Sequence, residues 1–366
     1  MKVGILTSSR ADYGIYLPLL QKMRLDSFFE LEIIAFGTHL SKFHGFTINQ
    51  IYKENYSKVH AISALISNDD EQSIATSYGL TTLKFADFWA ANPFDLVFCL
   101  GDRFEMSAAV QAGIPFGVKF AHIHGGETTL GAIDNIYRHQ ISLASKIHFT
   151  ASSIYAEKIV SIIQDTNNVY PVGALSLDEI NVFQPIEKDL FYSKFSIPNE
   201  DYALLTFHPE TLAMHDNLHF AKEMKQALLV LLEKIFLVIT MPNADTLGSV
   251  YRQQLEELKA EYPSRILLIE NFGKKNYFSA MHYAKLLIGN TSSGIIEAAS
   301  FRKYVVNVGD RQKGRVQSKN IFDTQFNSSE IIFNYNEAIK LGEFTGCNIY
   351  FKRGAADAII EIIKKI

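Results

Sequence analysis

The sequence LLIGNTSSGIIEAAS, residues 286–300, indicates the class of fold. Leu286–Ile288 is a short apolar run that predicts a buried strand, and Ile295–Ser300 predicts the start of a helix. The turn between them holds glycines and several small polar residues. A strand that leads through such a turn into a helix is typical of a parallel α/β sheet, whose ligands bind beyond the carboxyl ends of the strands.

The same alternation of strands and helices runs along the rest of the chain. Further apolar runs predict strands at Val3–Leu6, Leu31–Phe36, Leu96–Leu100, Val118–Ile123, Ile147–Thr150, Ala203–Phe207, Phe236–Thr240, Ile266–Ile269 and Val305–Val308. Helical spacing between them is found at Leu17–Met23, Met106–Ala112, Phe220–Glu233 and Tyr251–Glu261. Continuous apolar strands that alternate with helices indicate parallel sheets covered on both faces.

The length of 366 residues favours two domains of about 150 residues or more each. The regular pattern lapses over Val172–Asp201, which contains prolines and several charges and is the expected linker. We therefore predict an α/β protein with two doubly wound Rossmann-like domains, residues 1–172 and 173–353, that face a cleft. Residues 354–366 form an amphipathic helix, which we expect to pack back on the N-terminal domain.

Composition excludes several classes of protein. Hydrophobic residues make up 48% of the chain and charged residues 20%, as in an ordinary globular enzyme rather than a disordered protein. The net charge of -4 argues against binding to nucleic acid or to an anionic membrane, both of which attract basic proteins. Cys99 and Cys347 form neither a zinc spacing nor a disulfide framework, so we expect free thiols. No apolar stretch approaches the ~18 residues of a membrane span, and we expect a soluble, cytoplasmic protein.

The turn that follows Leu286–Ile288 predicts an anion site. A helix N-terminus presents N–H groups without helical partners and a partial positive charge, which together bind phosphate. Ser292 and Ser293 add hydroxyl donors, and Gly294 lets a ligand approach the backbone. Glu297 would repel a phosphate, so we expect it to accept hydrogen bonds from the hydroxyls of a ribose. The alternative is a serine N-cap that binds no ligand.

A basic loop follows the strand at Val305–Val308. Arg311, Lys313 and Arg315 place three cations within five residues, which favours a clamp for a diphosphate. Arg10, after the first strand, could supply charge from the opposite domain. The alternative is that the loop is a solvated basic loop and that Arg10 is an ordinary surface residue.

Candidate acids and bases gather in the first half of the chain. They are Asp102, His122, His124, Glu127 and Asp134, and His208 stands after the first strand of the second half. On a strand, His122 and His124 would point to the same face, and Asp134 and Arg138 would pair on a helix. Carboxylates close to imidazoles fit proton transfer at a sugar carbon. A metal held by the histidines is a weaker alternative, because no full ligand set is evident.

Two common nucleotide motifs are missing from the sequence. The turn after the first strand is TSSRADYG rather than a Gly-x-Gly-x-x-Gly, which counts against a nicotinamide dehydrogenase. No Gly-x-x-x-x-Gly-Lys-Ser/Thr occurs either, which counts against a P-loop kinase. The sequence therefore has neither of these motifs for a nicotinamide cofactor or for ATP, and no cofactor is expected.

Taken together, these motifs resemble the hydrolysing UDP-N-acetylglucosamine 2-epimerases, specifically the bacterial enzymes of sialic acid capsule synthesis. The resemblance runs from Met1 to about Arg353. The matching pieces are SRADYG (9–14), LGDRFE (100–105), HIHGGE (122–127), Asp134 to Arg138-His139, FHPETL (207–212), NADT (243–246), GNTSSGIIE (289–297) and GDRQKGRV (309–316). Each piece is short, but their order and spacing together are specific.

The resemblance implies a glycosyltransferase-B-like fold with the active site in the interdomain cleft and UDP mainly on the C-terminal domain. It implies that Asp102 and Asp134 carry the catalysis. We expect His124, Glu127 and His208 to act with them, with no metal. It implies that the nucleotide is contacted by Arg10, His208, Asn243, Ser292, Ser293, Glu297 and Arg315. We expect Arg103, Arg138 and Gly294 to bind substrate as well. Animal members of the family have a glutamate where this chain has His124, whereas the capsule-type bacterial enzymes share the histidine.

The implied reaction is elimination of UDP from the sugar to give 2-acetamidoglucal, followed by addition of water to give N-acetylmannosamine. UDP-N-acetylglucosamine is the expected substrate, UDP a product, and a homodimer or homotetramer the expected assembly. The closest alternative substrate is UDP-N,N'-diacetylbacillosamine, on the path to legionaminic acid. A UDP-sugar glycosyltransferase of the same fold and a non-catalytic UDP-sugar-binding regulator are further alternatives.

Overall fold

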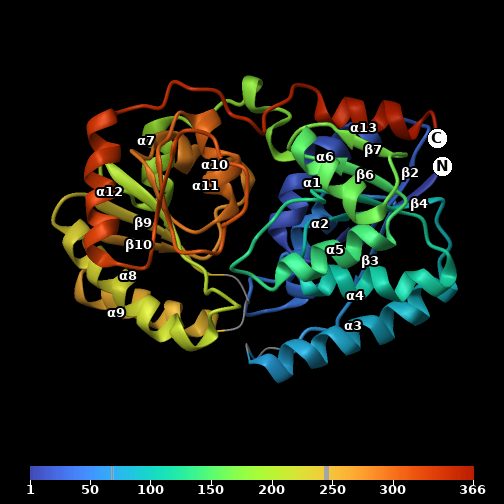
Figure 1. Ribbon diagram of the computed structural model, residues 1–366, viewed down its shortest axis with the longest axis horizontal. Helices are drawn as coiled ribbons and strands as arrows, with labels where there is room; N and C mark the ends of the chain where they lie inside the picture. The colour runs from blue at the N-terminus through green and yellow to red at the C-terminus, as the bar shows by residue number, and fades with distance from the viewer. Residues whose placement is uncertain (67, 69, 243–246) are drawn as a thin grey trace. The chain divides into compact units, whose positions relative to one another are not determined.

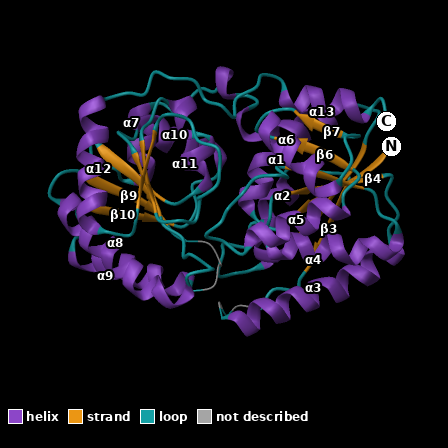
Figure 2. Cartoon of the chain, in the orientation of Figure 1, coloured by secondary structure: helices purple, strands orange, loops and turns teal. Residues whose placement is uncertain are grey.

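The computed structural model describes the whole chain except residues 67, 69 and 243–246. The chain forms two compact units (Figure 1). Unit 1 consists of Met1–Glu127, Asp134–Asn181 and Tyr350–Ile366, and unit 2 consists of Thr128–Ile133 and Val182–Ile349. Each unit has its own parallel sheet with helices around it (Figure 2), which confirms the predicted α/β fold with two Rossmann-like domains.

Unit 1 is built on a seven-stranded sheet in the order β3-β2-β1-β4-β5-β6-β7. Its strands are β1 Lys2–Thr7, β2 Glu30–Phe36, β3 Lys58–Ile62, β4 Leu96–Leu100, β5 Phe120–Ile123, β6 Ile147–Thr150 and β7 Val169–Pro171. Its helices are α1 Arg10–Arg24, α2 Ile48–Lys53, α3 Glu71–Ala91, α4 Phe104–Gly113, α5 Asp134–Ala144, α6 Ser153–Ile163 and α13 Ala355–Ile363. All the strand pairs are parallel, so every βα turn lies at the same edge of the sheet.

Unit 2 has a six-stranded parallel sheet in the order β10-β9-β8-β11-β12-β13. Its strands are β8 Tyr202–Thr206, β9 Phe236–Thr240, β10 Ile266–Ile269, β11 Leu287–Gly289, β12 Val305–Val308 and β13 Ile321–Thr324. Its helices are α7 Lys188–Phe195, α8 Asn217–Leu232, α9 Gly248–Glu261, α10 Lys274–Tyr283, α11 Ser292–Ile296 and α12 Ser328–Leu341. The core between the sheet and helices α8, α9 and α12 is almost wholly aliphatic and aromatic.

The strands that sequence analysis missed lie at the edges of the sheets. β3 and β7 are the two ends of the unit 1 sheet, and β13 is one end of the unit 2 sheet. An edge strand is covered less completely than a central one, and most residues of these strands are only half-buried or exposed. They therefore lack the continuous apolar run that identified the central strands.

The division between the units falls at Asn181/Val182 rather than at the expected 172/173. Leu175 belongs to the core of unit 1, and the backbone N–H of Ala356 donates to the Asp178 carboxylate at 3.2 Å. These contacts hold the start of the expected linker on unit 1. The rest of that linker is not irregular throughout, because it contains α7.

The chain joins unit 1 again at Tyr350, earlier than the expected 353/354. The hydroxyl of Tyr350 is hydrogen-bonded to that of Tyr155 at 2.8 Å, and its carbonyl accepts from the N–H of Ala174. Helix α13 then packs on α1, with Ala355, Ala356, Ile359 and Ile363 in the core of unit 1. The helix ends at Ile363, three residues before the end of the chain.

One short segment of the first half belongs to unit 2. Residues 128–133, which we call the strap, lie between β5 and α5 in sequence. The N–H of Leu130 donates to the Lys313 carbonyl at 2.9 Å, and the N–H of Ile133 donates to Thr211 Oγ1 at 2.9 Å. Gly131 lies so close to Asp310 that a Cβ at this position would collide with the Asp310 carbonyl.

No helix in the part of the chain that the structure describes is long and apolar enough to cross a membrane.

The packing of α13 on unit 1 predicts a large loss of stability for Ile359→Ala. Ile359 is fully buried, and truncating a buried isoleucine costs about 2–5 kcal/mol because it leaves a cavity. Urea unfolding should show this decrease. Ile366→Ala is the control, because Ile366 is 66% exposed and should change the free energy of unfolding by less than about 0.5 kcal/mol. Equal effects of the two variants would contradict the packing.

Candidate active site

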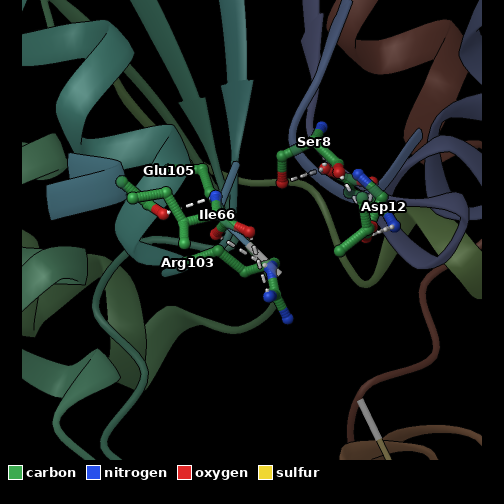
Figure 3. A network of polar contacts seen from close by, with 8 residues as sticks. Ser8, Asp12, Ile66, Arg103 and Glu105 are labelled. Atoms are coloured by element: carbon green, nitrogen blue, oxygen red, sulfur yellow. Dashed lines mark hydrogen bonds and ion pairs between the residues drawn. The ribbon is translucent and has the colours of Figure 1, made fainter. Parts of the chain in front are cut away.

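The turn between β1 and α1 is organised by the Asp12 carboxylate. It accepts the backbone N–H groups of Ser8 and Ser9 at 2.7 and 2.8 Å and both serine hydroxyls (Figure 3). Ser9 and Asp12 form a capping box, which explains why α1 begins at Arg10. The N–H groups that bind phosphate in a dinucleotide fold are thus occupied by a carboxylate of this chain. Arg10, the predicted ligand of UDP, is half-buried at the first position of α1.

Asp102 and Arg103 follow β4, as predicted for residues at a strand end. Arg103 makes a bidentate ion pair with Glu105, with Nε and Nη2 at 3.2 and 3.1 Å from the carboxylate oxygens (Figure 3). Glu105 is only 1% exposed, so it holds the Arg103 guanidinium in one orientation. Sequence analysis did not select Glu105 as a site residue.

Arg138 of α5 is almost fully buried, and it connects three segments of unit 1. Its Nη2 is ion-paired with the Asp102 carboxylate after β4. Its Nη1 donates to the backbone carbonyl of Glu127, after β5, at 2.9 Å. Asp134 begins α5, one turn before Arg138, and is half-buried. The structure therefore brings the predicted residues Asp102, Glu127 and Arg138 together.

His122 and His124 do not share one face of a strand, in contrast to the prediction. β5 ends at Ile123, and His124 has a φ of 64°, in the left-handed region that non-glycine residues seldom occupy. His122 stays in the strand, where its ring nitrogens contact the Ser142 hydroxyl at 3.0 Å and the Gly101 carbonyl at 2.9 Å. Its role is therefore structural.

His124 pairs with Glu127 across a tight turn. His124 Nδ1 lies 2.7 Å from Glu127 Oε1, and both side chains are buried. The intervening Gly126 has a φ of 81°, and a Cβ there would collide with the Tyr155 carbonyl. Only glycine allows this turn to close so that Glu127 returns to His124.

In unit 2, Asn290 fixes the backbone of the predicted residue His208. The His208 N–H donates to Asn290 Oδ1 at 2.7 Å, and Asn290 Nδ2 donates to the His208 carbonyl at 2.8 Å. Gln312 Nε2 in turn donates to the Asn290 carbonyl at 2.8 Å. The turns after β8, β11 and β12 are thus joined by buried amides. Sequence analysis quoted Asn290 within a motif but gave it no role.

The basic loop after β12 is partly neutralised by its own neighbours. Arg311 Nη1 donates to the Pro209 carbonyl at 2.8 Å, and Lys313 is ion-paired with Asp310 at 2.8 Å. The Asp310 N–H donates to the buried Glu210 carboxylate at 2.5 Å. Burial raises the pKa of Glu210, partly offset by that hydrogen bond. Arg315 lies half-buried on the same loop.

The predicted phosphate turn leads into α11, a helix of five residues, Ser292–Ile296. Ser292 and Ser293 are half-buried, whereas Gly294 and Glu297 are buried. Tyr277 of α10 lies within hydrogen-bonding reach of the Ser293 and Thr206 side chains, and burial raises its pKa to about 12. A tyrosine on a separate helix had no motif that could have identified it.

Two points remain: the predicted residue Asn243 and the weaker alternative of a metal ion. Asn243, predicted to bind substrate, lies outside the described residues. Among the residues that are described, no group of three or more His, Cys, Asp or Glu side chains is placed to hold a metal ion.

Most of this chain matches a known family of proteins. The family model for UDP-N-acetylglucosamine 2-epimerase matches residues 21–364. The chain belongs to this family. It is 33% identical over 340 residues, 92% of this chain and 88% of the other, to GDP/UDP-N,N'-diacetylbacillosamine 2-epimerase (hydrolyzing) of Campylobacter jejuni. It is 30% identical to UDP-N,N'-diacetylbacillosamine 2-epimerase (hydrolyzing) of Legionella pneumophila, over 100% of this chain and 96% of that protein.

Solved structures of the 2-epimerase family share the fold. The enzyme of Methanocaldococcus jannaschii in complex with UDP-GlcNAc and UDP superposes with a TM-score of 0.82 at 15% identity, covering 100% of both chains. The enzyme of Neisseria meningitidis bound to UDP-GlcNAc has a TM-score of 0.78 at 16% identity, again over 100% of both chains. These neighbours confirm the predicted glycosyltransferase-B-like class.

The buried histidines predict that this epimerase-family chain loses stability in acid. Burial lowers the pKa of His122 to about 3 and that of His148, on β6, to about 4. Both values lie below the ~6.5 of an unfolded chain. The unfolded state therefore binds more protons below pH ~6.5, and stability, complete above that pH, falls as the pH drops toward the folded values.

His148→Leu should reduce the slope of unfolding free energy against pH between about 4 and 6 by up to about 1.4 kcal/mol per pH unit, because it removes one such protonation. Urea unfolding at several pH values measures this slope. His219→Leu is the control, because His219 is exposed and water solvates its ring in both states. An unchanged slope in His148→Leu would refute the explanation.

Proposed function

We propose that this chain is a hydrolysing 2-epimerase, which converts UDP-N-acetylglucosamine and water into N-acetylmannosamine and UDP for sialic acid synthesis. The observation that carries the proposal is the group formed by the half-buried Asp102 with the buried Arg138, His124 and Glu127, in a chain of the 2-epimerase family. Buried acid and base groups at the carboxyl edge of a parallel sheet fit proton transfer. A relative named polysialic acid biosynthesis protein P7, from Escherichia coli, is 29% identical over 99% of this chain and 93% of its own length.

The proposed reaction has two steps. A base removes the proton from C2, the C2–H electrons form a C1=C2 double bond, and the C1–O bond to UDP breaks. Water then adds to the resulting 2-acetamidoglucal, with hydroxyl at C1 and a proton on the opposite face of C2. Asp102, His124, Glu127 and Asp134 are the proposed acid and base groups of unit 1, and His208 that of unit 2.

The C2 proton is weakly acidic, so stabilisation of the departing diphosphate must supply much of the rate. Arg10, Arg103, Arg138 and Arg315 are the proposed cationic ligands of the substrate, and Arg103 is held ready by Glu105. Ser292, Ser293, Gly294 and Glu297 are proposed to bind the nucleotide, with Tyr277 as a support for Ser293. Asn243 belongs to the same proposed set.

UDP-N,N'-diacetylbacillosamine is a second candidate substrate. The observation that favours it is the identity of 33% and 30% to two relatives named for that sugar, which differs from N-acetylglucosamine at C4 and C6. Both candidates keep the 2-acetamido group and the UDP leaving group, so the same elimination serves either one.

Incubation with each UDP-sugar in D2O tests the function and the substrate together. We expect NMR to show a free 2-epimerised sugar and UDP from one of the two, with deuterium at C2 because the incoming proton comes from solvent. A glycosyltransferase would leave UDP-sugar intact without an acceptor, and a regulator would bind it without turnover. Protium alone at C2 would contradict the elimination.

The nucleotide assignment predicts weaker binding of UDP itself in Ser293→Ala and Glu297→Ala. Each change leaves a buried polar group without its partner, which costs about 1–3 kcal/mol, or about 5- to 150-fold in affinity. Calorimetry with UDP measures the effect. Ser161→Ala is a matched control, because Ser161 is an exposed residue of unit 1 bonded only to its own helix. Unchanged affinity in both site variants would place the nucleotide elsewhere.

A further inference from the structure

His124 has three features that a purely structural histidine does not need. Its backbone is left-handed, its Nδ1 is held by Glu127 at 2.7 Å, and the residue is only 6% exposed. Within the described part of the chain, its Nε2 is buried and has no hydrogen-bond partner. An unusual backbone conformation and an unpaired buried nitrogen both cost free energy, and such costs are concentrated at functional sites.

The pairing with Glu127 determines which nitrogen of His124 carries the proton. An ionised carboxylate can only accept hydrogen bonds, so at neutral pH the short contact requires hydrogen on Nδ1. Nε2 then has a free lone pair and is the basic atom of the ring. His122, which lies in β5 two residues before His124, differs in this respect, because both of its ring nitrogens contact protein groups.

The surroundings of the pair keep Glu127 in place. Arg138 donates to the Glu127 carbonyl and is ion-paired with Asp102, so that the turn after β5 is anchored to α5 and β4. Positive charge on the His124 ring would therefore face the Glu127 carboxylate, with Arg138 already paired to a second carboxylate. The Glu127 carboxylate at Nδ1 would thus be the partner of the imidazolium that forms when Nε2 takes a proton.

We infer that His124 and Glu127 act as a dyad, in which Nε2 of His124 takes the proton from C2 of the UDP-sugar and Glu127 is a positioning residue. This inference rests on the proposed function and assigns the base within it. The C2–H electrons form the double bond as the C1–O bond to UDP breaks, and the Glu127 carboxylate offsets the charge of the imidazolium. His124 then releases its proton to water.

The test begins with the wild-type protein and needs no variant. Long-range ¹⁵N–¹H spectra of histidine-labelled protein at neutral pH should show His124 with hydrogen on Nδ1 and none on Nε2. Assignment comes from the loss of the signal in His124→Gln. The opposite tautomer in the wild type would overturn the inference.

Kinetics of two variants supply the second arm. His124→Gln should lower kcat by about 100-fold or more and leave the affinity for UDP within about threefold. Glu127→Gln keeps the size but removes the charge, and should lower kcat by about tenfold or more with KM within about threefold. His148→Leu is the control, since a buried histidine outside the site should affect stability but not kcat. A His124→Gln enzyme with more than a tenth of wild-type kcat would overturn the dyad.

The failure of the dyad and the failure of the proposed function are distinguishable. Absence of turnover of either UDP-sugar by the wild-type protein contradicts the function. Turnover by the wild type together with an active His124→Gln, or with the Nε2–H tautomer, contradicts only the dyad and assigns the C2 proton to a carboxylate.

Discussion

The buried guanidinium of Arg138 is the interaction on which the geometry of the unit 1 site depends. A charge removed from water is tolerated only when it is paired, and truncating one partner of such a pair typically costs about 3–5 kcal/mol. Arg138 meets this requirement with the Asp102 carboxylate and the Glu127 carbonyl. Because those groups follow β4 and β5, α5 has one position relative to the edge of the sheet, and the His124–Glu127 turn is held beside it.

Unit 2 orders its strand ends in part through neutral side-chain amides. Asn290 and Gln312 use their side-chain amides to join the backbones of three strand ends. A neutral amide offers both donors and acceptors, so it can organise a turn without adding charge to it. The site of unit 1 is thus ordered by carboxylates and a guanidinium, whereas in unit 2 amides act beside the buried Glu210 carboxylate, which accepts the Asp310 N–H.

Sequence analysis predicted the central strands because a buried parallel strand is a continuous apolar run. It predicted candidate site residues because polar residues follow those strands. Residues 96–100, 147–150, 236–240, 266–269 and 305–308 were predicted with their observed bounds. The edge strands β3, β7 and β13 were not predicted, because most of their residues are half-buried or exposed and so do not form a continuous apolar run.

Partners of the site residues were harder to predict than the residues themselves. Glu105, Asn290 and Tyr277 act through tertiary contacts that no local spacing encodes. The left-handed backbone of His124 was missed for the same reason, since a strand pattern cannot show where the strand stops. The domain boundaries differ from the predicted ones because Leu175 and Tyr350 are bound by tertiary contacts to unit 1.

The strap and the C-terminal helix together make the two units inseparable by a simple cut. The chain passes between the units at 127/128, 133/134, 181/182 and 349/350. A break at 181/182 would leave α13 on the C-terminal fragment, although it packs on unit 1. Apolar surface of α1 would then be exposed to water. The break would also separate the loop at Asp310–Lys313 from the strap that contacts it. Neither fragment would contain all the elements of one unit. Exchange of one unit between related proteins would therefore require a compatible strap and a compatible C-terminal helix as well as a compatible sheet.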